Sequence, residues 1–130
     1  IDVRDFVDHL IRELLVFYKS DNKNIEITCK IDSVEIKVDK AISLALIINE
    51  VITNCYKHAF KNRKEGKIDI FLQNTKEKNI LTIHDNGSGI DFNTISKESL
   101  GIDIIKGLAE QLDGVLKYEN KNGTLFTLTF

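Results

Sequence analysis

The amino-acid sequence predicts a two-layer α/β sandwich, in which a mixed, largely antiparallel sheet carries helices on one face. Three segments repeat apolar residues at helical spacing, and pairs of short alternating segments are interleaved with them. The chain has 130 residues, of which 42% are hydrophobic, and this is enough apolar material for one core. We therefore predict a single domain over residues 1–130.

The first element is predicted to be an amphipathic helix. Asp2 has a side chain suited to capping its first turn, and the helix is expected to end near residues 20–22, Ser-Asp-Asn. The apolar stripe that should face the core consists of Val3, Phe6, Val7, Leu10, Leu14 and Phe17.

Two short strands or a hairpin are expected next. Apolar residues alternate with polar ones at Ile25, Ile27 and Cys29, and they continue at Val34, Ile36 and Val38. Cys29 and Cys55 lie in patterned apolar segments and lack the spacing of a metal or redox motif. We expect both to be reduced core residues.

A central helix is predicted from residue 39 to about residue 60. Its apolar stripe consists of Ala41, Leu44, Ala45, Ile48, Val51, Ile52, Cys55 and Ala59. The opposite face of this helix is where we expect the chemistry.

The second half of the chain predicts a hairpin, a loop, a helix and a second hairpin. The first hairpin covers residues 68–72 and 79–84, and the polar loop covers residues 91–99. A helix marked by Ile104, Leu108 and Leu112 should close at Gly114. The last two strands, residues 115–119 and 124–130, flank a short connection that contains glycine, as in antiparallel pairs.

The composition excludes several classes of partner. A net charge of -2, from 18 basic and 20 acidic residues, gives no chain-wide attraction to nucleic acid or to anionic lipid. No apolar run approaches the roughly 18 residues that span a bilayer, and no signal-peptide pattern opens the chain. Because the chain starts with isoleucine and contains no methionine, we expect a segment of a longer protein, located in the cytoplasm.

The first cluster of chemical groups lies on the central helix. Spacings of three and four residues bring to one side Glu50, Asn54, Lys57, His58 and Lys61. A carboxylate, a carboxamide and cations within about two turns suit a magnesium nucleotide, with oxygen for the hard cation and positive charge for phosphate. The alternative is a solvated helix face, which is the default for charged residues.

The second cluster is Asp85-Asn86-Gly87-Ser88-Gly89, directly after a predicted strand. Its two glycines let the backbone take positive φ and let a ligand approach closely. An Asp is an acceptor-only group that can receive the exocyclic amine of adenine, whereas guanine offers a carbonyl at that position. The alternative is an ordinary turn built from Asp, Asn and Gly.

The third cluster is Ser99-Leu100-Gly101 at the start of a helix, where free amide groups favour phosphate. Its alternative is a simple helix start. His9 is expected to be a surface or half-buried helix residue and His84 a sheet residue, and with His58 they share no metal-ligand spacing. Gly66-Lys67 lacks the other residues of a P-loop.

The order of these clusters resembles the catalytic domains of sensor histidine kinases in the Bergerat ATP-binding superfamily. The resemblance extends to one subfamily, whose N box reads Asn-Glu-Leu-x-Thr-Asn-Ala-x-Lys-His-Ala-Phe. Here the matching string is Asn49-Glu50-Val51-Ile52-Thr53-Asn54-Cys55-Tyr56-Lys57-His58-Ala59-Phe60. Residues 85–89 match the first glycine box, Leu100-Gly101 the second, and Gly123-Thr124-Leu125-Phe126 the closing box, so the resemblance covers essentially the whole chain.

The resemblance implies a role for each residue. Asn54 is expected to bind Mg²⁺, Lys57 and His58 to contact phosphate, and Asp85 to read adenine. Further residues expected at the nucleotide are Gly87, Gly89, Leu100, Gly101 and Thr124. Glu50 is implied either as an outer-sphere magnesium contact or as a polarising base, and residues 91–99 correspond to a short ATP lid.

The implied activity is transfer of the ATP γ-phosphoryl group to a histidine on a separate dimerisation domain, with a response regulator as downstream partner. Three rivals share the fold or its ligand. These are a serine kinase of the anti-sigma-factor type, an ATPase related to gyrase or to the mismatch-repair proteins, and a pseudo-kinase that binds nucleotide or proteins without transferring phosphate.

Overall fold

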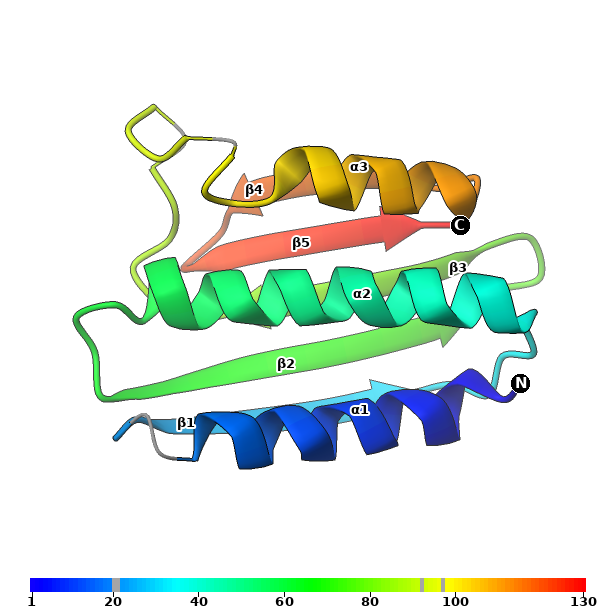
Figure 1. Cartoon of the computed structure of the whole chain (residues 1–130), viewed down its shortest axis with the longest axis horizontal. Helices are drawn as coiled ribbons and strands as arrows, with labels where there is room; N and C mark the ends of the chain where they lie inside the picture. Colours follow the sequence, from blue (N-terminus) through cyan, green and yellow to red (C-terminus); the bar gives the residue numbers. More distant parts are fainter. Residues whose placement is uncertain (20–21, 92, 97) are drawn as a thin grey trace.

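The computed structural model describes residues 1–19, 22–91, 93–96 and 98–130, and within these ranges it contains three α-helices, one π-helical turn and five strands. The helices all cover the same face of the sheet (Figure 1). In chain order the elements are α1 Val3–Tyr18, β1 Asn24–Ile31, α2 Val38–Asn54, η1 Cys55–Ala59, β2 Glu65–Asn74, β3 Asn79–Asp85, α3 Ile102–Gln111, β4 Val115–Asn120 and β5 Thr124–Thr129. The predicted two-layer sandwich is therefore confirmed.

The sheet is mixed, as predicted, with strand order β1-β2-β3-β5-β4. The β2/β3 and β4/β5 hairpins and the β3/β5 pair are antiparallel, and β1 with β2 is the parallel pair. Ile83 of β3 pairs with Ile70 on one side and with Phe126 on the other, so the three central strands align their apolar residues. This alignment forms one apolar face beneath the helices.

The core lies between that face and α2. Leu44, Ile48 and Ile52 of α2 are completely buried. They belong to one continuous cluster with the inward residues of the sheet, which include Ile68, Ile70, Leu72, Leu81, Ile83, Phe126 and Leu128. Burial of this apolar area is the main source of stability for the fold.

The prediction of a second strand at residues 34–38 is wrong. The alternating residues there pair with the start of the chain instead of forming a hairpin with β1: Val3 N donates to Val34 O at 2.9 Å, and Ile36 N donates to Ile1 O at 3.1 Å. Val38 already opens α2. Alternation of apolar and polar residues indicates which side chains face inward, and Val34 is indeed buried. The alternation does not identify the segment with which these residues pair.

The predicted first helix is confirmed, including its cap, since the Asp2 side chain accepts a hydrogen bond from Arg4 N. Its inward face is rotated from the prediction. Ile11 is buried, whereas Phe17 is 73% exposed. Residues 20 and 21 of the expected helix end lie outside the described residues.

Cys55 is buried, as predicted, but the expectation that Cys29 is a core residue is wrong. Cys29 is exposed on β1, which is an edge strand of the sheet and is only partly covered by α1. Both thiols are free.

The central helix changes its hydrogen bonding at the predicted site. It is α-helical to Asn54 and continues as the π-helical turn η1, which closes with a bond from Phe60 N to Cys55 O at 2.8 Å. Lys23 holds the end of this turn, because its Nζ donates to Phe60 O at 2.5 Å and to Arg63 O at 2.8 Å. Single π-helical turns often occur at functional sites.

The remaining predicted elements are confirmed. α3 ends with Gly114 N bonded to Ala109 O at 2.9 Å, although the residue with positive φ is Asp113. Among the residues that the structure describes, none of the helices is long and apolar enough to cross a membrane.

Candidate functional site

Asp85 ends β3 as a carboxylate that is only 1% exposed. Its Oδ1 accepts hydrogen bonds from Gly87 N at 2.9 Å and from Thr124 N at 3.1 Å. Its Oδ2 accepts from the Cys55 thiol at 3.5 Å. Donors from the glycine loop, from β5 and from η1 therefore converge on one buried charge.

Thr124 lies beside this carboxylate at the start of β5. It is 3% exposed, and its Oγ1 has no hydrogen-bond partner among the residues that the structure describes. A buried hydroxyl left without a partner costs about 1–3 kcal/mol. Such a group is well suited to receive a polar ligand.

Glycines let two turns approach Asp85 and η1. A side chain at Gly87 would overlap Ala59 O, and the neighbouring Ser88 N donates to the same oxygen at 3.0 Å. A side chain at Gly123, whose φ is +115°, would overlap the carbonyl oxygen of Asp85. Glycine at these positions is therefore required by backbone packing itself, before any ligand is considered.

Asn54 faces inward, contrary to the prediction that it lies opposite the apolar stripe. It is 2% exposed, and its Nδ2 donates to Leu100 O at 2.7 Å. The reason is that α3 and the segment before it pack along this side of α2. The structure thereby joins the first and third sequence clusters.

Gly101 is the N-cap residue of α3 and has a φ of +64°. An added Cβ there would lie 2.9 Å from Glu50 Oε2. Glu50 and Asn54 thus both face the Leu100-Gly101 turn.

Tyr118 is a site residue that sequence reasoning missed. Its hydroxyl accepts a long hydrogen bond, 3.5 Å, from Asn54 Nδ2. Burial raises the pKa of the Tyr118 phenol, the bond from Asn54 lowers it, and the carboxylates of Asp85 and Glu50 raise it further. The inward position on β4 was readable from alternation, but nothing in the sequence placed it among these groups.

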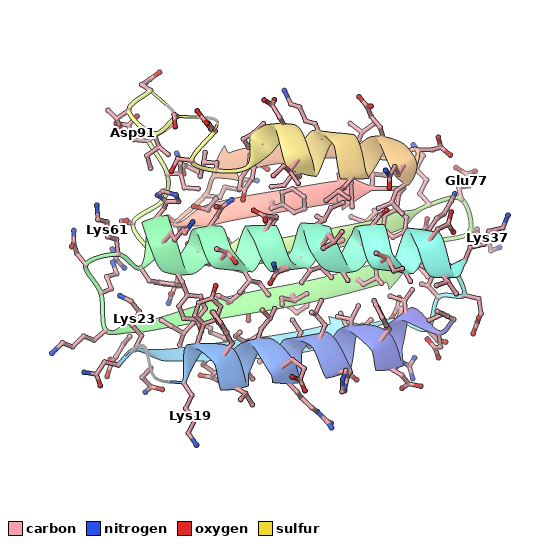
Figure 2. The ribbon with its side chains drawn as sticks, viewed as in Figure 1. Lys19, Lys23, Lys37, Lys61, Glu77 and Asp91 are labelled. Carbon is pink, nitrogen blue, oxygen red and sulfur yellow. The ribbon has the colours of Figure 1, made fainter. Side chains whose placement is uncertain are left out.

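His58 and Lys57 take different positions. His58 Nε2 lies 3.4 Å from Ser99 Oγ, across a hollow of about 400 Å³. That hollow is lined by His58, Lys61, Thr94, Ile95, Ser96 and Ser99. Figure 2 shows Lys61 and Asp91 at the same end of the molecule.

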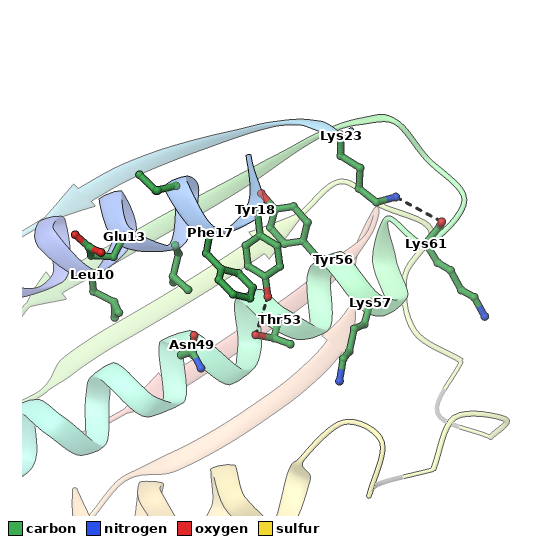
Figure 3. A pocket seen from close by; sticks show the side chains of 12 residues that line it. Leu10, Glu13, Phe17, Tyr18, Lys23, Asn49, Thr53, Tyr56, Lys57 and Lys61 are labelled. Carbon is green, nitrogen blue, oxygen red and sulfur yellow. Dashed lines mark hydrogen bonds between the residues drawn. The ribbon is translucent and has the colours of Figure 1, made fainter. Parts of the chain in front are cut away.

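Lys57 is exposed on the outer side of η1, where it lines a larger hollow of about 1020 Å³ between α1 and α2. In Figure 3 its side chain points away from Phe17 and Tyr18 of α1. Of the predicted site residues, this hollow includes Lys57 and neither Asp85 nor Asn54. We therefore locate the candidate site at the smaller hollow and at Asp85.

The residues present fit a magnesium ion that is held chiefly by a ligand. No group of three or more His, Cys, Asp and Glu side chains in the described part of the chain could hold a metal alone. Mg²⁺ bound with nucleotide phosphates usually takes only one or two protein oxygens and keeps several waters. With its Nδ2 engaged by Leu100 O, Asn54 has its carboxamide oxygen to offer, and the Glu50 carboxylate is nearby.

The predicted lid, residues 91–99, is irregular where it is described. Its turns are closed by Ile95 N bonding to Asp91 O at 3.0 Å and by Ser99 N bonding to Ser96 Oγ at 3.1 Å. Residues 92 and 97 lie outside the described residues. At its end Leu100 packs in a small cluster with Ile90 and Ile102.

The fold is that of known histidine kinases. The blue-light-activated histidine kinase EL346 of Erythrobacter litoralis superimposes with a TM-score of 0.87 at 22% identity, covering 100% of this chain and 42% of that one. The mycobacterial sensor histidine kinase MprB superimposes with a TM-score of 0.75 at 17% identity, and the match covers 100% of this chain and 94% of that one.

Sequence relatives include two kinds of protein kinase. Blue-light-activated histidine kinase 2 of Erythrobacter litoralis is 28% identical over 95 residues, which are 71% of this chain and 28% of that protein. Sensor histidine kinase PdtaS of Mycobacterium tuberculosis is 32% identical over 82 residues, 60% of this chain and 16% of that protein. Serine-protein kinase RsbW of Listeria innocua is 34% identical over 55 residues, which are 42% of this chain and 35% of that protein.

The matched part of this chain thus spans 28% of the length of blue-light-activated histidine kinase 2 and 16% of the length of PdtaS. Residues 39–130 match the family described as histidine kinase-, DNA gyrase B-, and HSP90-like ATPase. This segment contains α2, the buried Asp85 and the Thr124 hydroxyl beside it. The chain belongs to this family of ATPases.

Proposed function

We propose that this chain is the ATP-binding catalytic domain of a sensor histidine kinase of the N-box subfamily noted above. In this role it transfers the γ-phosphoryl group of ATP to a histidine on a separate dimerisation domain, which then supplies a response regulator. The observation that carries the proposal is the unpartnered, buried Thr124 hydroxyl next to the buried Asp85 carboxylate. Family membership makes ATP the natural ligand for that pair.

The adenine end of the site is Asp85 with Thr124. Asp85 accepts the exocyclic amine of adenine, because a carboxylate is an acceptor-only group and adenine carries its donor there. Thr124 supplies a hydroxyl that can donate or accept. Gly87 lets its loop pack against Ala59 O and donate to Asp85, and Gly89 takes a positive φ in the same loop, so the glycines position the loop beside the proposed adenine site.

The phosphate end is formed by α2, η1 and the α3 N-terminus. Asn54 offers its carboxamide oxygen to Mg²⁺, and Glu50 acts as an outer-sphere contact or as a polarising base. Bound Mg²⁺ supplies neutralisation of the phosphate charge. His58 and the amide groups in the first turn of α3 add hydrogen-bond donors. Lys57, whose side chain points away from Phe17 and Tyr18 of α1, adds positive charge.

The reaction needs little covalent work from these residues. A neutral ring nitrogen of the acceptor histidine attacks the γ-phosphorus, the bond between phosphorus and the β,γ-bridging oxygen breaks, and ADP leaves with that oxygen. The acceptor nitrogen already holds a lone pair, so a strong base is unnecessary. The contribution of the domain is positioning and charge neutralisation, which dominate phosphoryl transfer.

The alternative is a serine kinase that uses the same nucleotide site; the likeness to RsbW covers only 42% of this chain and does not favour it over the histidine kinase. The chemical stability of the product separates the two. Phosphoserine survives acid, whereas phosphohistidine is stable only under mildly alkaline conditions and is lost in acid.

Calorimetry tests the nucleotide proposal directly. The expected result is that Mg-ADP binds at least about fivefold more tightly than Mg-GDP, since one mispaired buried polar group costs about 1–3 kcal/mol. Equal affinity for the two nucleotides, or no binding of either, would contradict it.

A further inference from the structure

We propose that Cys55 sets the preference of this site for adenine over guanine by occupying one acceptor position of Asp85. It acts through Asp85 and is therefore a positioning residue. This inference rests on the proposed function, because it assumes that Asp85 reads the base.

The argument begins with the acceptor capacity of Asp85. An ionised carboxylate has about four lone-pair sites, two on each oxygen. Oδ1 already receives two backbone donors, Gly87 N at 2.9 Å and Thr124 N at 3.1 Å. These donors belong to the glycine loop and to the start of β5, so no side-chain change removes them. Oδ1 is full.

The Cys55 thiol takes one site on Oδ2, at a distance of 3.5 Å from Sγ. Cys55 is 5% exposed and its thiol is free. Burial raises the pKa of this thiol, and the adjacent Asp85 raises it further, so it remains an S–H donor at physiological pH. One acceptor site is then left on Asp85.

A single remaining acceptor site on Asp85 fits adenine but not guanine. The edge of adenine presents a single donor group, the 6-amino group, next to the acceptor N1. Guanine presents two adjacent donors to a carboxylate, N1–H and the 2-amino group. Because Oδ1 is full, both would have to be received by Oδ2, which has two acceptor sites only when the thiol does not fill one of them. By filling the second site, the thiol acts against guanine, which is specificity gained by excluding the wrong ligand.

A role as a plain core residue makes a different prediction. The sequence pattern alone gives Cys55 only this role, as part of the apolar stripe of the central helix. If that were its whole role, changing it would loosen the site and weaken both nucleotides to the same extent. The ratio of the two affinities therefore separates the two roles.

The experiment measures the dissociation constants of Mg-ADP and Mg-GDP by calorimetry for the wild-type chain and four variants. Cys55→Ala and Cys55→Val both remove the donor, the first with a side chain smaller than cysteine and the second with a larger one. Cys55→Ser retains a donor. Cys29→Ala is the matched control, since Cys29 is exposed on β1.

Cys55→Ala and Cys55→Val are expected to reduce the preference for ADP over GDP by about 3–10-fold, the worth of one hydrogen bond. Cys55→Ser and Cys29→Ala should keep the wild-type ratio within about twofold. Thermal unfolding of each variant identifies any that fail to fold, and Cys55→Val then replaces Cys55→Ala.

Equal weakening of ADP and GDP in the folded donor-free variants would overturn the proposal, and so would a lost preference in Cys55→Ser. A wild-type chain that binds neither nucleotide would instead overturn the proposed function. The two failures are therefore distinguishable.

Discussion

At the scale of single residues, Asp85 keeps its carboxylate buried because three donors from separate elements meet it. Asp85→Asn replaces one oxygen with an amino group. Whichever way the amide turns, that group meets donors: the two backbone N–H groups, or the thiol and the adenine amine. We predict that ADP affinity, measured by calorimetry, falls at least about fivefold, in line with about 1–3 kcal/mol for a mispaired buried group.

Asp69→Asn is the matched control for this prediction. Asp69 lies on β2, where its side chain contacts Thr28 and Lys67, and it is 30% exposed. Its change should leave ADP affinity within about twofold of wild type, because it touches none of the site residues. An Asp85→Asn variant that binds ADP as well as this control would refute the role of Asp85.

For Asn54, the structure adds an effect on stability to the predicted effect on magnesium binding. Because its side chain is buried and bonded to Leu100 O, Asn54→Ala should reduce the free energy of unfolding by about 1 kcal/mol as well as altering the site. We predict that it removes most of the increase in ADP affinity that Mg²⁺ provides. The measurement compares ADP dissociation constants in Mg²⁺ and in chelator.

Asn49→Ala serves as the control, since Asn49 is half-buried on α2 but lines the hollow between α1 and α2. It should retain the full effect of Mg²⁺, and Glu50→Gln should weaken binding less than Asn54→Ala. If Asn54→Ala keeps the wild-type response to Mg²⁺, Asn54 does not bind the metal.

The motifs selected Asp85, Asn54 and the glycines as candidate residues by their order along the chain, because each cluster alone also fits an ordinary turn, a helix start or a solvated helix face. They did not reveal that Cys55 donates to Asp85 or that Tyr118 reaches Asn54. Such contacts depend on the register of β4 with β5 and on the packing of α3 against α2. Neither can be read from a local spacing.

At the scale of elements, Lys23 ties the start of β1 to the end of η1. Its ammonium group donates to the carbonyls of Phe60 and Arg63, which end the helix without other capping side chains among the described contacts. Figure 3 shows the Lys23 side chain extending to this end of the helix. We predict that Lys23→Ala lowers the free energy of unfolding by about 1–2 kcal/mol, because charged donors contribute about that much.

Urea denaturation measures this effect, with Lys30→Ala as the control. Lys30 is exposed on β1, and its substitution should change the free energy of unfolding by less than about 0.5 kcal/mol. Equal stabilities of the two variants would show that the Lys23 contacts contribute nothing.

The elements themselves were largely predictable, and the exceptions share a cause. Helices and hairpins depend on neighbours within a few residues, so periodicity located α2, β2/β3 and β4/β5 well. The parallel partner of β1 is β2, whose paired residues lie 41 positions further along the chain. Local alternation could not identify that partner, and it suggested a hairpin with residues 34–38 instead.

At the scale of the whole molecule, the three histidines are separated by the architecture. His58 lies at the small hollow near Ser99, and His9 is exposed on α1. His84 alternates with the inward-facing Ile83 and Asp85, so it lies on the outer face of the sheet, where its Nε2 is 2.8 Å from Lys121 O. The prediction of His84 as a sheet residue is confirmed.

This separation predicts that the chain binds ATP but does not phosphorylate itself. In-line transfer requires the reacting atoms to approach within about 3–3.5 Å. His84 is on the far side of the sheet, His9 is on a helix packed at its edge, and His58 lies at the small hollow, where we propose that it contacts phosphate. The measurement is incubation with γ-labelled ATP under mildly alkaline conditions, with and without the dimerisation domain of the same protein. Label is expected only on the added domain. Label on the chain alone that disappears in His9→Ala would contradict the prediction, and acid-stable label on a serine would instead support the serine-kinase candidate.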